Sequence, residues 1–205
     1  MSTEERKTIY LCLAHMSEEG YEQKYVKEAF DTNWVVPMGP NVNAFEQNLA
    51  DFANANSDGS KLARKVVCLS AGTAAVHLAL IACGVKAGDE VCVQSFTFCA
   101  SSHPITYLGA KPVFIDSERE TWNMDPELLE KAIIERKAAI GKYPKAIIPV
   151  ALYGMPYDCE RIMAIADKYG IPVIEDAAEG LGSRFNGQVL GTFGRFGVLS
   201  FNGNK

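Results

Sequence analysis

Residues 158–175 read Asp-Cys-Glu-Arg-Ile-Met-Ala-Ile-Ala-Asp-Lys-Tyr-Gly-Ile-Pro-Val-Ile-Glu, a helical pattern followed at once by a β-branched run. Asp158 has the side chain of a helix N-cap, and Gly170 is a typical helix stop because glycine readily adopts the left-handed conformation. The proline that follows cannot continue a helix, and Val173–Glu175 favours an extended chain. The stretch predicts a helix between Asp158 and Gly170 and then a buried strand.

The same alternation extends outward, from about Lys65 to the end of the chain. Its apolar runs are almost continuous, as expected for strands that helices cover on both faces. Asp125-Pro126-Glu127 supplies an N-cap, a proline at the first helical position and a dipole-favoured acid, which predicts a helix over Leu128–Lys137. This order predicts an α/β fold with an open, mostly parallel sheet and helices on both faces. Besides Val173–Glu175, the candidate strands are Val66–Leu69, Glu90–Val93, Pro112–Ile115, Ala146–Ile148 and Val198–Phe201.

The first 60 residues follow a different pattern. Amphipathic helices are predicted over Glu22–Phe30 and Asn43–Ala53, and a fixed loop is predicted between them, over Thr32–Pro40, where one glycine and two prolines occur. Without a repeat or a linker, residues 1–205 are predicted to form one domain. We expect the chain to continue past Lys205, because its last residues leave a buried strand with no helix to cover it.

Composition and charge make some functional classes, such as nucleic-acid binding and membrane proteins, improbable for this chain. The 205 residues carry 20 Lys and Arg against 25 Asp and Glu, a net charge of −5 that argues against nucleic-acid binding. No apolar run is long enough to span a bilayer, and the charged start Met1–Lys7 lacks the apolar core of a signal peptide, so we expect a cytoplasmic protein with no membrane partner. Neither disulfides nor a metal site are expected from the spacing of Cys12, Cys68, Cys83, Cys92, Cys99, Cys159, His15, His77 and His103.

Ligands of open α/β sheets bind beyond the carboxyl ends of the strands, and two candidate segments there are built of small or aromatic residues. Ser70–Ala75, which contains Gly72 and Thr73, leads into an Ala-rich helix whose free N–H groups suit a phosphate. A tight turn that needs small residues explains the same pattern. Phe96, after the strand at Glu90–Val93, could stack on a flat ligand or be a core residue.

Two further segments carry charge. Asp176 and Glu179 directly follow a predicted buried strand, and a carboxylate there needs a donor or a cation such as a protonated ring nitrogen. Capping of the next turn is the alternative role for Asp176. Ser200 and Lys205 leave the last strand, where a hydroxyl could bind phosphate and an amine could form a Schiff base. A solvated surface position is the alternative for Lys205.

The order of these segments resembles the DegT/DnrJ/EryC1/StrS sugar aminotransferases, enzymes of fold type I that use pyridoxal 5′-phosphate (PLP). The resemblance runs from about Asp31 to Lys205 and is carried by the Gly-Thr helix start, Glu-Asp-Ala-Ala-Glu at 175–179, Gly-Thr-Phe-Gly at 191–194 and Ser-Phe-Asn-Gly-Asn-Lys at 200–205. Finer similarity is to the branch that acts on UDP-linked 4-keto-6-deoxy-N-acetylhexosamine in the N-acetylbacillosamine pathway. The family resemblance implies that a small C-terminal domain, absent from this chain, follows the large domain.

The resemblance implies a role for each candidate residue. Lys205 would be the catalytic lysine that holds PLP covalently, and Asp176 would pair with the pyridinium nitrogen. The phosphate of PLP would be bound by Gly72, Thr73 and Ser200, and its ring face would be covered by Phe96. Glu179 would contact the 3-hydroxyl of PLP, and Asn202 would contact the substrate.

It also implies a homodimer with shared active sites that transfers the amino group of L-glutamate to a nucleotide-linked 4-keto-6-deoxy sugar, giving the 4-amino sugar. Three alternatives remain. A sugar dehydratase of the same family would carry histidine where Lys205 stands, and a non-catalytic sensor with the same fold would show no turnover. A dinucleotide-binding dehydrogenase would need the G-x-G-x-x-G pattern, which the sequence lacks.

Overall fold

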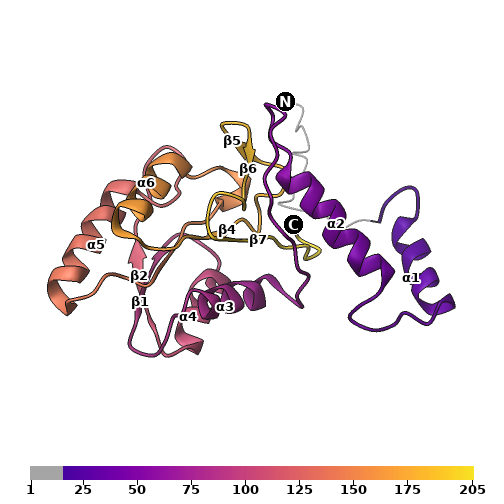
Figure 1. Cartoon of the computed structure of the whole chain (residues 1–205), viewed down its shortest axis with the longest axis horizontal. Coiled ribbons are helices and arrows are strands. Elements are labelled where there is room, and N and C mark those ends of the chain that lie inside the picture. Colours follow the sequence, from indigo (N-terminus) through magenta and orange to yellow (C-terminus); the bar gives the residue numbers. More distant parts are fainter. Residues whose placement is uncertain (1–15) are drawn as a thin grey trace, which may run out of the picture.

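The computed structural model describes residues 16–205, so the segment Met1–Lys7, Cys12 and His15 lie outside the described residues. Parallel strands form its centre (Figure 1). Strand β1 lies between β2 and β3, and β4 pairs with β7. Two isolated parallel bridges, Ile147–Val173 and Val150–Asp176, join the β3 and β4 segments. The order across the sheet is β2-β1-β3-β4-β7, from β1 (Glu90–Gln94), β2 (Lys111–Ile115), β3 (Ala146–Ile148), β4 (Ile174–Asp176) and β7 (Phe196–Val198).

Helices cover both faces of this sheet, as predicted. The first layer is α5 (Pro126–Ile140) with α6 (Cys159–Tyr169), and the second is α3 (Gly72–Ala82) with the short α4 (His103–Tyr107). In Figure 1 these two pairs lie on opposite sides of the strands. The predicted α/β architecture is therefore confirmed.

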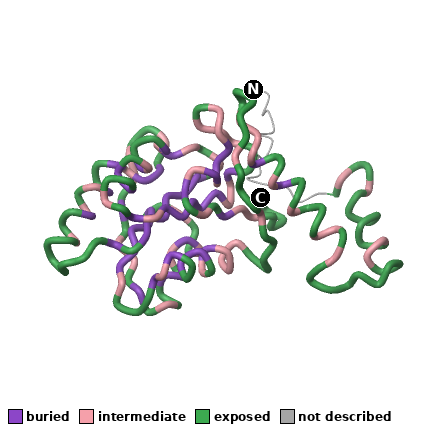
Figure 2. Tube along the Cα trace, viewed as in Figure 1, coloured by how far each residue is buried: buried purple, intermediate pink, exposed green. Residues whose placement is uncertain are grey.

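Alternation of side chains along the central strands assigns each one to a layer. In β1, Cys92 packs in the cluster that contains Leu129 of α5, whereas Val91 and Val93 pack in the cluster that contains Leu80 of α3. Successive side chains of a strand point to opposite faces, so an unbroken apolar run is what a doubly covered strand requires. Figure 2 shows the buried segments gathered along the sheet.

Local signals set the start of α5 and both ends of α6 where the sequence predicts them, whereas α5 continues past the predicted Lys137 to Ile140. The Asp125 carboxylate accepts a hydrogen bond from the backbone of Glu127 at 2.7 Å, and that of Asp158 accepts one from Arg161 at 3.0 Å. Gly170 ends α6 in the left-handed conformation, at φ 66°. Each cap satisfies groups that a helix end leaves unpaired.

The N-terminal helices are α1 (Tyr21–Asp31) and α2 (Pro40–Asn54), close to the predicted bounds. Helix α2 begins at the last residue of the predicted loop, because proline is favoured in the first helical turn. Helix α1 has no buried residue, and Figures 1 and 2 show it set apart from the sheet.

Two strand predictions need correction. Val66–Leu69 forms no strand: Val67 is 71% exposed, and the backbone N–H of Cys68 donates to the Glu46 side chain instead of to a neighbouring strand. The strand predicted over Val198–Phe201 is also shifted, since β7 ends at Val198. Its partner β4 ends at Asp176, which pairs with Val198, so within the described residues Leu199–Phe201 have no strand beside them to pair with. An apolar run becomes a strand only where a second chain completes its hydrogen bonds.

The remaining elements are short: the 3₁₀ turns η1 (Cys99–Ser101) and η2 (Leu152–Gly154), and a hairpin of β5 (Arg184–Phe185) and β6 (Gln188–Val189). Across residues 16–205, no helix is both long and apolar enough to cross a membrane. All cysteines in that range are free; Cys68 and Cys99 are exposed, and the others are buried.

Candidate active site

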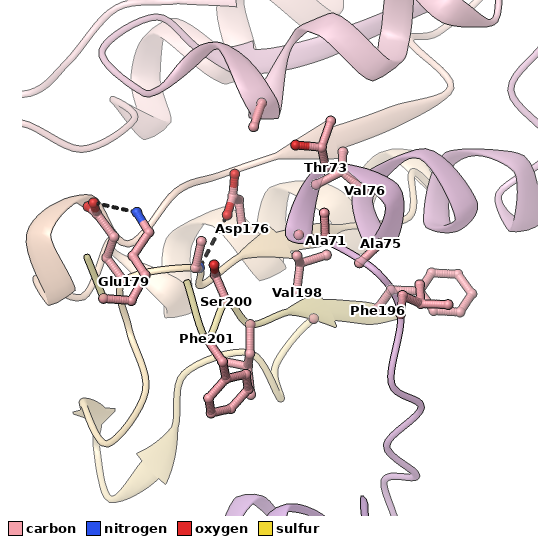
Figure 3. A pocket seen from close by; sticks show the side chains of 18 of the residues that line it. Ala71, Thr73, Ala75, Val76, Asp176, Glu179, Phe196, Val198, Ser200 and Phe201 are labelled. Carbon is pink, nitrogen blue, oxygen red and sulfur yellow. Dashed lines mark hydrogen bonds and ion pairs between the residues drawn. The ribbon is translucent and has the colours of Figure 1, made fainter. Parts of the chain in front are cut away.

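A cavity of about 980 Å³ opens at the carboxyl ends of β4 and β7, beside the first turn of α3. Loops that follow β1 and β3 complete its wall. Figure 3 shows Thr73, Asp176, Glu179 and Ser200 around it. The structure brings together at this one hollow every residue predicted for the site: Gly72, Thr73, Phe96, Asp176, Glu179, Ser200, Asn202 and Lys205.

The start of α3 offers an open set of backbone donors. Ala71, at the N-cap, makes no side-chain capping bond, so no side chain caps the first N–H groups of the helix, and Ala71, Gly72 and Thr73 line the cavity. A Cβ added to Gly72 would lie 3.7 Å from Cβ of Ser200, which places Ser200 directly beside the helix start. Two hydroxyls, those of Thr73 and Ser200, therefore accompany the helix N-terminus, a combination suited to a phosphate.

Asp176 ends β4 as a nearly buried carboxylate that is 6% exposed. Its Oδ2 accepts a hydrogen bond from Ser101 Oγ at 2.5 Å, and its Oδ1 accepts one from the Ala178 N–H at 3.2 Å. Within residues 16–205 it forms no ion pair. Burial raises the pKa of Asp176, and the Ser101 hydrogen bond opposes that rise. Such a carboxylate is ready to receive a cation from a ligand.

The Ala178 contact also resembles the capping role considered for Asp176, but it uses only one carboxylate oxygen. Ser101 was not predicted from the sequence. It is one of several serines near the end of β1, and nothing in its spacing distinguishes it from Ser95 or Ser102.

Lys205 lies on the other side of the cavity, paired with Glu179. Its Nζ is 2.9 Å from Glu179 Oε1, and its side chain is 19% exposed although the residue as a whole is exposed, so the amine is paired and not free in solvent. Glu179 Oε2 accepts a hydrogen bond from the backbone N–H of Tyr153 at 2.7 Å. Tyr153 has a left-handed backbone, at φ 50°, which is a strained conformation for a bulky residue and turns its N–H toward the carboxylate. Sequence reasoning missed Tyr153, because no residue type signals this conformation.

Phe96 and Asn202 complete the predicted set. Phe96 is 46% exposed, so the alternative of a core position is wrong, and its ring lies 5.9 Å from that of Trp122. Asn202 is exposed and donates through Nδ2 to Asn204. Both residues line the cavity, to which Phe96 contributes an aromatic ring and Asn202 a side-chain amide.

A buried glutamate fixes the loop that forms the cavity floor. Glu175 is completely buried and accepts hydrogen bonds from the backbone N–H groups of Gly191, at 3.0 Å, and Gly194, at 2.6 Å. Burial raises the pKa of Glu175. The sequence analysis placed Glu175 at the end of a strand and in the motif at 175–179 but gave it no role. Its charge at the end of an apolar run was the available signal.

These groups match the chemistry of PLP. The open helix start suits its phosphate, the buried carboxylate lacking a cation suits its ring nitrogen, and Phe96 offers an aromatic face for its ring. Lys205 supplies a primary amine at the same hollow. In residues 16–205, no three His, Cys, Asp or Glu side chains gather as metal ligands would.

Comparisons with known proteins agree with this geometry. The model of the DegT/DnrJ/EryC1/StrS aminotransferase family matches residues 16–205. The chain is 53% identical over 199 residues to "Putative pyridoxal phosphate-dependent aminotransferase EpsN" of Bacillus subtilis (strain 168), which covers 97% of this chain and 48% of that protein. It is 44% identical over 153 residues to UDP-2-acetamido-2-deoxy-3-oxo-D-glucuronate aminotransferase of Pseudomonas aeruginosa, with 74% and 38% covered.

A solved structure, "Putative sugar aminotransferase Spr1654 from Streptococcus pneumoniae, PLP-form", matches with a TM-score of 0.78 and 30% identity, over 97% of this chain and 50% of that one. The chain thus spans about half the length, or less, of these relatives. The predicted fold-type I architecture is confirmed, and the predicted cofactor agrees with that of the family and of this structural neighbour. On this evidence, the chain belongs to the DegT/DnrJ/EryC1/StrS aminotransferase family.

Proposed function

We propose that residues 1–205 form the N-terminal segment and cofactor-binding large domain of a PLP-dependent nucleotide-sugar aminotransferase. The observation that carries the proposal is the cavity itself. It joins a buried carboxylate without a cation, a lysine amine and an uncapped helix start. Each group alone has an ordinary structural explanation, whereas their meeting at one hollow fits one class of cofactor.

In this function, each wall of the cavity holds one part of PLP. Gly72, Thr73 and Ser200 bind the phosphate, and Asp176 pairs with the ring nitrogen. Phe96 covers the ring face, and Glu179 contacts the 3-hydroxyl. When bound, PLP supplies an electron sink that stabilises negative charge at the carbon next to the amino group.

Lys205 has two tasks in this scheme. It binds the cofactor covalently, and, when the amino donor displaces it, its free Nζ moves the proton taken from the donor Cα. Glu179, 2.9 Å from that nitrogen, can hold the ammonium form between these tasks, and Tyr153 N–H keeps the Glu179 carboxylate in place. The lysine at position 205 disfavours the dehydratase alternative, because such a dehydratase carries histidine at that position.

For the substrates, we propose L-glutamate as donor and a UDP-linked 4-keto-6-deoxy-N-acetylhexosamine as acceptor, with Asn202 as one sugar contact. The similarity of the sequence to the family branch that acts on UDP-linked 4-keto-6-deoxy-N-acetylhexosamine supports this acceptor. A 3-keto sugar is the second candidate, because the relative from Pseudomonas aeruginosa is named for a UDP-linked 3-oxo sugar. A homodimer with shared active sites completes the proposal.

The first test is an absorption spectrum of the purified full-length protein with PLP, before and after L-glutamate is added. We expect a yellow band that glutamate bleaches, and then conversion of a UDP-linked 4-keto sugar to an amino sugar by mass spectrometry. Lys205→Ala should abolish turnover, whereas Lys142→Ala, at an exposed surface pair with Asp89, should not. A protein that stays colourless with PLP would favour the sensor, and conversion of only the 3-keto sugar would reassign the acceptor.

A further inference from the structure

Ser101 is the closest polar contact of Asp176 and comes from a distant part of the chain. It lies in η1, 75 residues before Asp176, and is completely buried. Its Oγ is 2.5 Å from Asp176 Oδ2. A buried hydroxyl at this distance from a carboxylate forms a strong, charge-assisted hydrogen bond.

A second hydroxyl supports Ser101 from behind. Thr97 Oγ1 lies 2.8 Å from Ser101 Oγ. An ionised carboxylate only accepts hydrogen bonds, so the single hydroxyl proton of Ser101 goes to Asp176. Thr97 must then donate to Ser101, which gives a one-way chain of donors from Thr97 through Ser101 to Asp176.

This chain acts on a carboxylate whose surroundings otherwise disfavour charge. Burial raises the pKa of Asp176, and the Ser101 hydrogen bond is the strongest influence that lowers it. The charged groups that face the carboxylate are Lys205, which lowers its pKa, and Glu179, which raises it. Since Lys205 is already paired with Glu179, the charged form is supported locally by the hydroxyl chain and, more weakly, by the Ala178 N–H.

We propose that Ser101, supported by Thr97, is a positioning residue that orients the Asp176 carboxylate and keeps it ionised for the ring nitrogen of the cofactor. The inference rests on the proposed function, which pairs Asp176 with that nitrogen. It adds two residues of the loop after β1 to the machinery, although neither needs to touch the cofactor in order to act.

The test measures binding of pyridoxamine 5′-phosphate, which is not covalently held, to the full-length protein by fluorescence titration between pH 5 and 9. Ser101→Ala should weaken binding about tenfold or more at neutral pH, the scale of one charge-assisted hydrogen bond. It should also move the acid limb of the binding profile to higher pH, because Asp176 then takes up a proton more readily. A merely structural role would weaken binding equally at every pH.

Matched variants separate the outcomes. Ser102→Ala removes the neighbouring hydroxyl, which donates to the Cys99 carbonyl and not to Asp176, and should leave the profile unchanged. Thr97→Val should shift the acid limb in the same direction by less, and Thr97→Ser should restore it. If Ser101→Ala does not fold, as judged by circular dichroism, the two Thr97 variants decide.

Asp176→Asn distinguishes this inference from the function beneath it. If Asp176→Asn loses binding while Ser101→Ala, or the Thr97 pair, keeps the parent profile, the positioning role is refuted and the proposed function stands. If Asp176→Asn binds pyridoxamine 5′-phosphate as tightly as the parent protein, the pairing of Asp176 with the cofactor is refuted as well.

Discussion

Replacing Gly197 by alanine tests how the floor of the cavity is held, because this position leaves no room for a side chain. A Cβ at Gly197 would lie 1.9 Å from the carbonyl oxygen of Gly191, 2.5 Å from its carbonyl carbon and 2.7 Å from its Cα. All three are backbone atoms, so no change of rotamer relieves the contact. The N–H of Gly191 is bound to the buried Glu175 carboxylate, so a shift of this loop also strains that hydrogen bond.

The size of the effect follows from these contacts. Overpacking a well-filled site typically costs about 1–3 kcal/mol, and a clash with backbone belongs at the upper end, near about 3 kcal/mol. For a chain of about 150–250 residues, each kcal/mol lowers the melting temperature by about 2–4 °C, and by less in a longer chain, so we expect a decrease of at most about 12 °C for Gly197→Ala.

Urea and thermal unfolding of the full-length protein measure this loss. Gly203→Ala is the matched control, because a Cβ at Gly203 meets nothing within 4 Å and the residue has no positive φ. The control should unfold within about 0.5 kcal/mol of the parent protein. A Gly197→Ala protein as stable as the control would refute the reasoning that Gly191 and Gly197 lock the floor of the cavity.

Two further predictions concern buried titratable groups. Because burial raises the folded-state pKa of Asp176, its ionised form opposes folding, so Asp176→Asn should stabilise the cofactor-free protein at pH 8 by about 1 kcal/mol. The gain should shrink as the pH falls through the raised pKa, and chemical denaturation at pH 8 and 5 measures both values; a constant difference would contradict the linkage. Burial also raises the pKa of Cys92 and of Cys159 to about 12, so a thiol reagent at pH 8 should label Cys68 and Cys99 long before these two, as peptide mass spectrometry would show. Equal labelling rates would contradict the burial of the two thiols.

The sequence alone determined the architecture wherever the signals are local. Asp125 and Asp158 cap their helices as predicted, and Gly170 ends α6. Continuous apolar runs identified strands that helices cover on both faces. The run at Val66–Leu69 has the same composition yet forms no strand, because strand pairing depends on a second chain segment that the run itself does not specify.

For the candidate site, the order of motifs along the chain and the family it resembles were enough to name eight of the residues that line the cavity. Chemistry that depends on residue type, such as a lysine amine or an uncapped helix start, is visible in a single segment. The tertiary structure alone decided which groups support them. Ser101 reaches Asp176 across 75 residues, and Tyr153 turns its N–H toward Glu179 through a strained backbone. Such contacts arise where separate strand ends meet at one edge of the sheet, and no local pattern encodes that meeting.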